Sequence, residues 1–143
     1  MKFKCQVDIA RDRATVIEFF DNPDNMRYWQ DDFISFDHQD GEPGMPGATS
    51  IIKYKRVELL ETILERNLPD AFHGSYEGSW GKNTMYNYFE ELGPNQTRWR
   101  AEVEYVRKTA LMMKLMATLF PSMFRKQTQK WMDQFKYFVE SKT

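Results

Sequence analysis

The stretch TALMMKLMATLFPSMFRKQTQKWMDQFKYFVES, residues 109–141, decides the fold expected for this chain. Its polar side chains recur every three or four residues and form one narrow stripe: Lys114, Thr118, Ser122, Arg125, Gln129, Asp133, Lys136 and Glu140. The opposite face is apolar: Met113, Met116, Phe120, Met123, Phe124, Trp131 and Phe138. This pattern predicts a long helix, which we expect Pro121 to kink or divide because proline removes a backbone hydrogen bond. Such a helix is stable only when its apolar face is covered.

Strands earlier in the chain are the available cover for this helix. Residues 2–9 alternate between apolar and polar side chains, which predicts a half-buried strand. Asp12 can then cap a short helix, and Asn22 followed by Pro23 indicates the start of a second one that ends near Gln30.

Six further runs have the composition of strands. They cover residues 31–38, 48–56, 58–67, 71–78, 83–91 and 97–106. Glycine, proline and asparagine separate them, and the connections are too short for parallel crossovers. We therefore expect an antiparallel meander that continues into the helix.

This order of elements resembles the START-like superfamily, also called the Bet v 1-like (SRPBCC) or polyketide cyclase/dehydrase-like group. Residues 9–20 resemble its first strand-to-helix entry, and NPDNMRYWQ at 22–30 resembles its second helix with a closing tryptophan. GEPGMPGATS at 41–50, ELLETILERNLPD at 58–70 and FRKQTQKWMDQFKYF at 124–138 are also similar to members of this group. These motifs specify shape and contain no catalytic signature.

The resemblance extends over residues 1–143 and implies one α+β domain with the helix-grip fold. In that fold a seven-stranded curved antiparallel sheet wraps around a long C-terminal helix, with two short helices after the first strand. The resemblance also implies a cavity between sheet and helix for lipids, sterols, polyketides or aromatic compounds. Some members of the group are cyclases or dehydratases, and others only carry ligands.

Composition limits the partners and the location that we expect. The chain has 20 basic and 21 acidic residues, so neither nucleic acid nor an anionic membrane is the partner expected first. It has one cysteine, no apolar run of a signal peptide and no stretch long enough to span a bilayer, which favours the cytoplasm. We expect a monomer or homodimer without a metal or cofactor.

The helix offers the first candidate site residues. Met113, Met116, Phe120 and Met123 either pack as core or form a pliable cavity wall, because methionine adapts to irregular shapes. Gln127 on the same face is the candidate polar anchor for a ligand.

The strands and the second short helix add further candidates. Inward-facing side chains are expected at Trp29, Tyr54, Tyr76, Met85, Asn87 and Trp99. Asn87 faces the helix in one strand register, whereas Tyr86 and Tyr88 do so in the other, because a shift of one residue exchanges the faces.

The titratable residues give weaker signals. His38 and His73 are the only histidines, and His73 is expected to point outward. Glu61 and Glu65 are expected on an outer, solvated face; the alternative is a buried carboxyl group with a raised pKa that acts as a general acid.

Three functions follow from these residues. The leading hypothesis is binding of an apolar small molecule, such as a lipid, polyketide or aromatic compound. The second is a cyclase- or dehydratase-type enzyme that acts on such a ligand, and the third is a protein-interaction module that presents the Met-rich segment 110–124. The sequence leaves open whether the chain is an enzyme.

Overall fold

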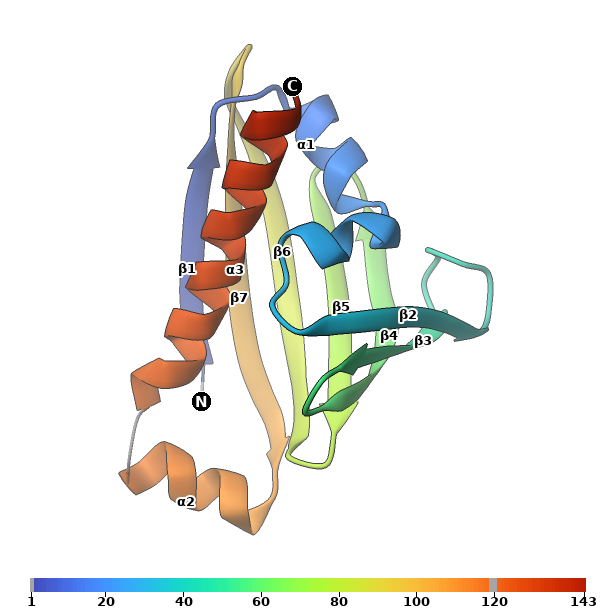
Figure 1. Cartoon of the computed structure of the whole chain (residues 1–143), viewed down its shortest axis with the longest axis vertical. Coiled ribbons are helices and arrows are strands. Elements are labelled where there is room, and N and C mark those ends of the chain that lie inside the picture. Colours follow the sequence, from blue (N-terminus) through green and yellow to red (C-terminus); the bar gives the residue numbers. More distant parts are fainter. Residues whose placement is uncertain (1, 119–120) are drawn as a thin grey trace.

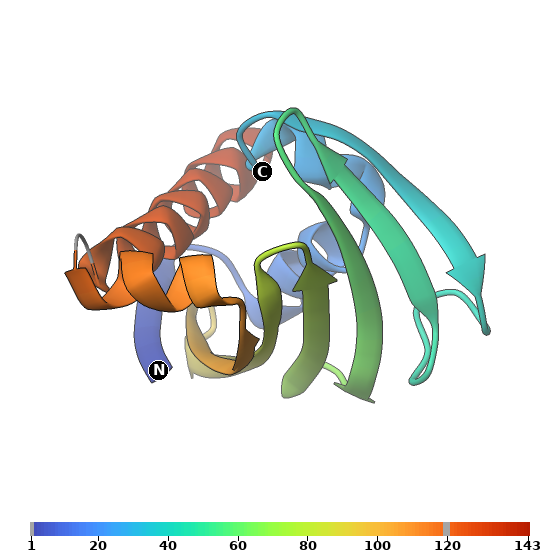
Figure 2. The ribbon, with the colours of Figure 1, turned by 90° about the horizontal axis from the view of Figure 1, so that it is seen from below.

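Antiparallel strands form one curved sheet, and the last helix lies across its concave side (Figures 1 and 2). The structure is a computed structural model that describes residues 2–118 and 121–143, without the side chains of residues 115–118 and 121. Its elements are β1 (Lys2–Ile9), α1 (Arg13–Phe20), the 3-10 helix η1 (Pro23–Tyr28), β2 (Phe33–Asp40), β3 (Thr49–Tyr54), β4 (Glu58–Asn67), β5 (Ala71–Gly78), β6 (Gly81–Gly93), β7 (Gln96–Lys108), α2 (Ala110–Thr118) and α3 (Pro121–Lys142).

Both short helices begin where the capping residues predict. The Asp12 carboxylate accepts a hydrogen bond from the Thr15 backbone N–H at 3.1 Å and so satisfies a free donor at the start of α1. Asn22 does the same for η1, in which Pro23 is the first residue. The second helix ends at Tyr28, slightly earlier than predicted.

The meander and the helix-grip architecture are confirmed. The strands lie in the order β1-β7-β6-β5-β4-β3-β2, and every neighbouring pair is antiparallel. Five of the pairs therefore join strands consecutive in sequence, and β1 adds to the far edge beside β7. This arrangement curves the sheet around α3.

The C-terminal segment forms two helices. Pro121 is the first residue of α3, a position where its missing N–H costs no helical hydrogen bond. Figure 1 shows α3 running along the sheet, whereas α2 turns away across its lower end. Because the helix is divided, the two parts of the predicted apolar face no longer point in one direction.

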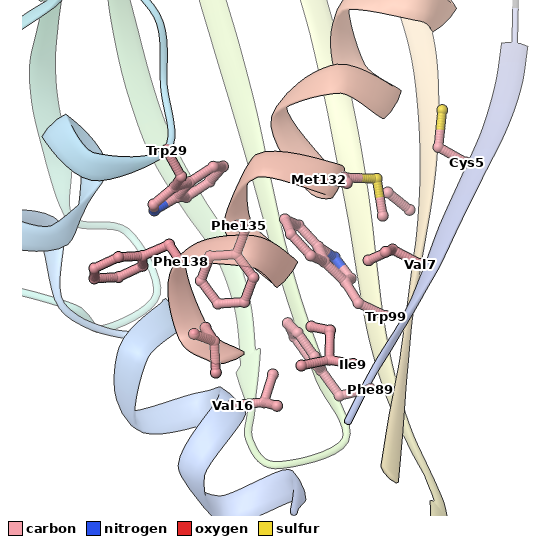
Figure 3. Close-up of a cluster of buried hydrophobic side chains, with 12 residues drawn as sticks. Cys5, Val7, Ile9, Val16, Trp29, Phe89, Trp99, Met132, Phe135 and Phe138 are labelled. Atoms are coloured by element: carbon pink, nitrogen blue, oxygen red, sulfur yellow. The ribbon is translucent and has the colours of Figure 1, made fainter. Parts of the chain in front are cut away.

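Aromatic packing joins the C-terminal half of α3 to the sheet (Figure 3). The ring of Phe135 is fully buried, with its centroid 5.2 Å from those of both Trp29 and Trp99. The cluster also contains Ile9 of β1 and Val16 of α1. This part of the concave side is therefore solidly filled.

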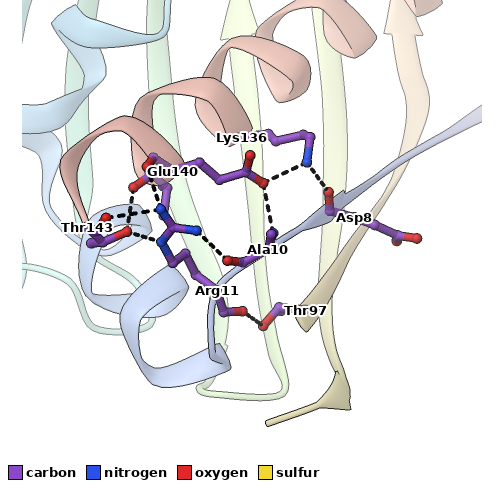
Figure 4. Close-up of polar contacts among 8 residues, drawn as sticks. Asp8, Ala10, Arg11, Thr97, Lys136, Glu140 and Thr143 are labelled. Atoms are coloured by element: carbon purple, nitrogen blue, oxygen red, sulfur yellow. Dashed lines mark hydrogen bonds and ion pairs between the residues drawn. The ribbon is translucent and has the colours of Figure 1, made fainter. Parts of the chain in front are cut away.

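Polar contacts fix the end of α3 against the chain between β1 and α1 (Figure 4). The ammonium group of Lys136 donates to the Asp8 carbonyl at 2.8 Å, and the Ala10 backbone N–H donates to the Glu140 carboxylate at 2.8 Å. The Arg11 guanidinium donates to the backbone carbonyls of Glu140 and Thr143. These bonds hold α3 over the sheet independently of its apolar face.

Among the described residues, no helix combines the length and apolar character needed to cross a membrane.

Candidate ligand-binding site

A cavity of about 530 Å³ lies between the concave face of the sheet and the N-terminal half of α3. The helix contributes Gln127, Thr128, Trp131 and Met132, so its last two turns fill the core while its earlier turns border open space. The volume falls within the range of roughly 300–1,000 Å³ that is typical of small-molecule sites.

Several of the predicted site residues line this cavity. They are Trp29, Tyr54, Tyr76, Met85, Asn87, Trp99 and Gln127. Gln127 is itself exposed, so it borders the cavity from the solvent side rather than from within the core.

The methionines N-terminal to Gln127 do not line the cavity. The side chains of Met113 and Met123 are 51% and 47% exposed, because α2 turns away from α3 and leaves them uncovered. Their predicted place on the cavity wall is therefore wrong. The side chain of Met116 and the whole of Phe120 lie outside the described residues.

The register of β6 turns Asn87 inward. The amide oxygen of Asn87 accepts a hydrogen bond from the indole N–H of Trp99 at 2.8 Å, and both side chains are almost fully buried. Tyr86 and Tyr88 point to the other face, where their rings pack against His73 with centroids 5.1 Å away. The inward amide is thus already paired with a core tryptophan.

Glu61 corrects the expectation of a solvated face. Its side chain is buried and lines the cavity, whereas Glu65 is exposed and lies 3.3 Å from the outward-facing His73 imidazole. The register of β4 against β5 shifts between Ile63 and Glu65. This bulge reverses the alternation of faces, so the two glutamates lie on opposite sides of the sheet.

Glu61 and Tyr76 form a polar pair inside the cavity. They are directly opposite each other on β4 and β5, and the tyrosine hydroxyl donates to the Glu61 carboxylate at 2.9 Å. Gly74 allows this contact, because a Cβ there would lie 3.0 Å from the Tyr76 hydroxyl oxygen.

Burial governs the charge of this pair. Desolvation raises the pKa of the Glu61 carboxyl group above its ordinary value, and the hydrogen bond from Tyr76 opposes the shift only in part. Burial, together with the Glu61 charge, also raises the pKa of the Tyr76 hydroxyl. The Tyr76 hydroxyl therefore keeps its proton near pH 7, and the Glu61 carboxyl group keeps its proton to a higher pH than an exposed glutamate does.

Tyr54 carries a second polar group on the same wall. Its hydroxyl donates to the Gln30 side-chain oxygen at 2.5 Å, and its ring stacks on Trp131 with centroids 5.4 Å apart. Burial raises the pKa of Tyr54, and desolvation raises the pKa of Tyr105 to about 12. Both phenols stay neutral near pH 7 and present hydrogen-bonding tips on apolar rings.

The rim of the cavity is polar and exposed. The Arg66 guanidinium pairs with the Asp21 carboxylate and also donates to the Gly44 carbonyl, which ties β4 to the end of α1 and to the β2–β3 loop. Pro43 and Met45 of that loop are exposed and line the cavity. The edge of the cavity therefore reaches the protein surface at this loop.

In the described part of the chain, no three His, Cys, Asp or Glu side chains gather in a way that could hold a metal ion. His38 borders the cavity from β2, and His73 lies on the opposite face of the sheet.

Among the polar side chains that line the cavity, sequence reasoning did not propose Gln30, placed Glu61 there only as the alternative to a solvated face, and did not propose Arg66. The alternation of β4 contained a signal for the second, since Glu61 stands two residues before the apolar Ile63 and shares its face. Arg66 was not predictable in this way, because the bulge that turns it inward leaves no clear mark in the sequence.

The comparisons with known proteins support the fold. No family model matches the chain, and no curated protein matches it. The structure of Ara h 8.0201 superimposes with a TM-score of 0.76 at 11% identity, over 99% of this chain and 98% of that chain. Norcoclaurine synthase from Thalictrum flavum, solved in complex with dopamine and hydroxybenzaldehyde, superimposes with a TM-score of 0.73 at 11% identity, over 100% of this chain and 88% of that chain.

A START superfamily protein from Mycobacterium smegmatis gives a TM-score of 0.68 at 12% identity, over 93% of this chain and 97% of that chain. Identities this low establish shape rather than activity. The strand order, the gripping helix and these likenesses together show that the chain has the helix-grip fold of the Bet v 1-like and START-like proteins.

Proposed function

We propose that this protein binds a mostly apolar small molecule that carries one polar group, with that group held by Glu61 and Tyr76. The single observation that carries this proposal is the buried carboxyl–hydroxyl pair in an otherwise largely apolar cavity of about 530 Å³. An unpaired buried carboxyl group is costly, so a ligand that completes its hydrogen bonds gains affinity and orientation there.

The remaining walls match an apolar ligand, such as an aromatic compound, a polyketide or a lipid. Aromatic rings, aliphatic side chains and methionines supply most of the surface, among them Phe36, Ile52, Ile63, Phe72 and Met85. Pockets of this composition, with a few polar anchors, are the usual form of small-molecule sites. Norcoclaurine synthase, which has a similar fold and was solved with dopamine and hydroxybenzaldehyde, supports a small aromatic compound as the ligand.

Native mass spectrometry of the gently purified protein tests the proposal. The wild type should retain a small molecule from the expression host, and Met85→Trp should lose it because the larger side chain fills the cavity. Tyr86→Trp is the matched control, since it places the same indole on the other face of the sheet. Equal retention of the molecule by Met85→Trp and the control would overturn the proposal.

General acid–base catalysis in the same cavity is a second candidate function. The observation that favours it is the raised pKa of the buried Glu61 carboxyl group beside the Tyr76 hydroxyl. A carboxyl group that keeps its proton to a higher pH than usual can protonate a bound substrate, as a cyclase or dehydratase requires.

Turnover of the retained molecule and its close analogues separates the two functions. Under catalysis, Glu61→Gln should still bind the molecule but lower kcat by about 10²–10⁴-fold, because the amide cannot transfer the proton. Unchanged turnover in Glu61→Gln would exclude this residue as the acid.

A further inference from the structure

Four exposed apolar side chains lie at one end of the molecule, away from the aromatic core. Val106, at the end of β7, is 53% exposed; Leu111 and Met113, in α2, are 69% and 51% exposed; and Met123, near the start of α3, is 47% exposed. Figure 1 shows these three elements meeting at the lower end of the sheet. Leu111 and Met113 are two residues apart in α2 and therefore lie on opposite flanks of that helix. We call this region of the molecule the apolar end.

The part of the chain that carries the apolar end is rich in positive charge. Residues 105–132 contain six lysines and arginines and no aspartate or glutamate, in a chain whose overall numbers are 20 and 21. Arg107 pairs with Glu77 and Lys130 pairs with Asp31. Among the described residues, Lys108 and Lys126 form no ion pair with a carboxylate, and the Arg125 side chain bonds to the backbone carbonyl of Lys4. The total charge of the chain is balanced, but residues 105–132 carry a net positive charge.

We propose that the apolar end docks on the surface of a negatively charged membrane. Cationic side chains around exposed aliphatic and methionine side chains are the two components of interfacial binding, in which charge attracts and apolar groups insert. A bilayer accepts such a surface without shape complementarity, whereas a stable protein interface requires it.

The docking surface continues directly into the cavity wall. Gln127 follows Met123 by one helical turn on the same face of α3, and both Gln127 and Thr128 line the cavity. An apolar ligand leaving the bilayer at this point would enter the cavity with a short path through water. Membrane docking itself does not depend on what the cavity binds.

Co-sedimentation with vesicles tests the proposal. The probes are vesicles of phosphatidylcholine alone and vesicles with phosphatidylcholine and phosphatidylserine in a ratio of about 3:1. Wild-type protein should bind the anionic vesicles, bind the neutral ones much more weakly, and dissociate from the anionic ones as salt is raised.

Two double variants separate charge from apolar insertion. Lys108→Gln with Lys126→Gln should weaken partition into anionic vesicles by about 25-fold, since each cation near such a surface contributes about fivefold. Leu111→Gln with Met113→Gln should weaken it by about tenfold or more through lost apolar burial. The control, Leu92→Gln with Lys142→Gln, changes one leucine and one lysine outside the apolar end, at the ends of β6 and α3, and should bind like the wild type.

Circular dichroism and thermal unfolding confirm that each variant is folded before it is compared. Equal partition of wild type and both end variants would overturn the proposal, as would equal binding to neutral and anionic vesicles. Absence of vesicle binding combined with a dimer that the end variants dissociate would also overturn it and assign the surface to a second copy of the chain. Met85→Trp should bind vesicles normally, so failure of the ligand proposal is distinguishable from failure of this one.

Discussion

At the scale of single residues, burial gives Glu61 its chemistry. The exposed glutamates of this chain are solvated, whereas Glu61 lies in the cavity with Tyr76 as its hydrogen-bond donor. Its charge is therefore disfavoured in the folded state, which links the protonation of one side chain to the stability of the whole domain.

The pH dependence of unfolding tests this link. Because the pKa of Glu61 is raised from 4.5, the folded protein retains a proton that the unfolded chain has already released as pH rises above about 4.5. The stability contributed by this residue is thus present below about pH 4.5 and is lost as pH rises above that value and through the raised pKa of the folded state. Urea unfolding of Glu61→Gln and the wild type should show a difference that grows with pH in favour of the variant.

The control for this measurement is Glu58→Gln, an exposed position on the same strand. Its difference from the wild type should show no comparable rise across the same pH range. A difference between Glu61→Gln and the wild type that stays constant with pH would contradict the buried-carboxyl interpretation.

The Asn87–Trp99 bond is the second residue-scale feature with a measurable cost. Asn87→Ala leaves the buried Trp99 N–H without a partner, which should destabilise the fold by about 1–3 kcal/mol in urea unfolding. A double-mutant cycle with Trp99→Phe should give a coupling energy of at least about 0.5 kcal/mol. A coupling energy near zero would show that the hydrogen bond contributes nothing to the stability of the core.

At the scale of elements, the two halves of α3 have different tasks. The C-terminal half buries Phe135, Phe138 and Val139 in the aromatic core, and the N-terminal half borders the cavity. The C-terminal turns of α3 therefore contribute to stability, and its N-terminal turns border the proposed binding site.

Alanine substitutions in the C-terminal half test this division. Phe135→Ala should lower the free energy of unfolding by about 3–5 kcal/mol, because it removes a fully buried ring and leaves a void. Tyr137→Ala, two residues on and 78% exposed, should change it by no more than about 0.5 kcal/mol. Comparable losses in chemical denaturation for both variants would refute the proposed division of the helix.

At the scale of the whole molecule, the grip of the sheet around α3 leaves space that a compact core would fill. Any molecule that binds only the folded state raises the apparent stability, by about 2.7 kcal/mol at a free concentration one hundred times its Kd. The cavity therefore couples ligand binding to global unfolding.

Thermal unfolding with the molecule retained by the wild type checks this coupling. The wild type and Tyr86→Trp should gain several degrees in Tm on its addition, whereas Met85→Trp should gain none because its cavity is filled. An equal gain in Met85→Trp would place the ligand outside this cavity.

Local patterns determined most of the secondary structure, the capped helix starts, the antiparallel meander and a break at Pro121, because these depend on periodicity, turn residues and backbone chemistry that neighbouring residues carry. Only the tertiary structure decided which side chains meet. The bulge between Ile63 and Glu65 turned one glutamate into the cavity and the other out, and the turn of α2 away from α3 exposed the methionines predicted to line the wall. A one-residue register shift or a change in helix direction has a small local free-energy cost, yet it changes which side chains face the cavity. Long-range packing therefore decides the lining of the cavity.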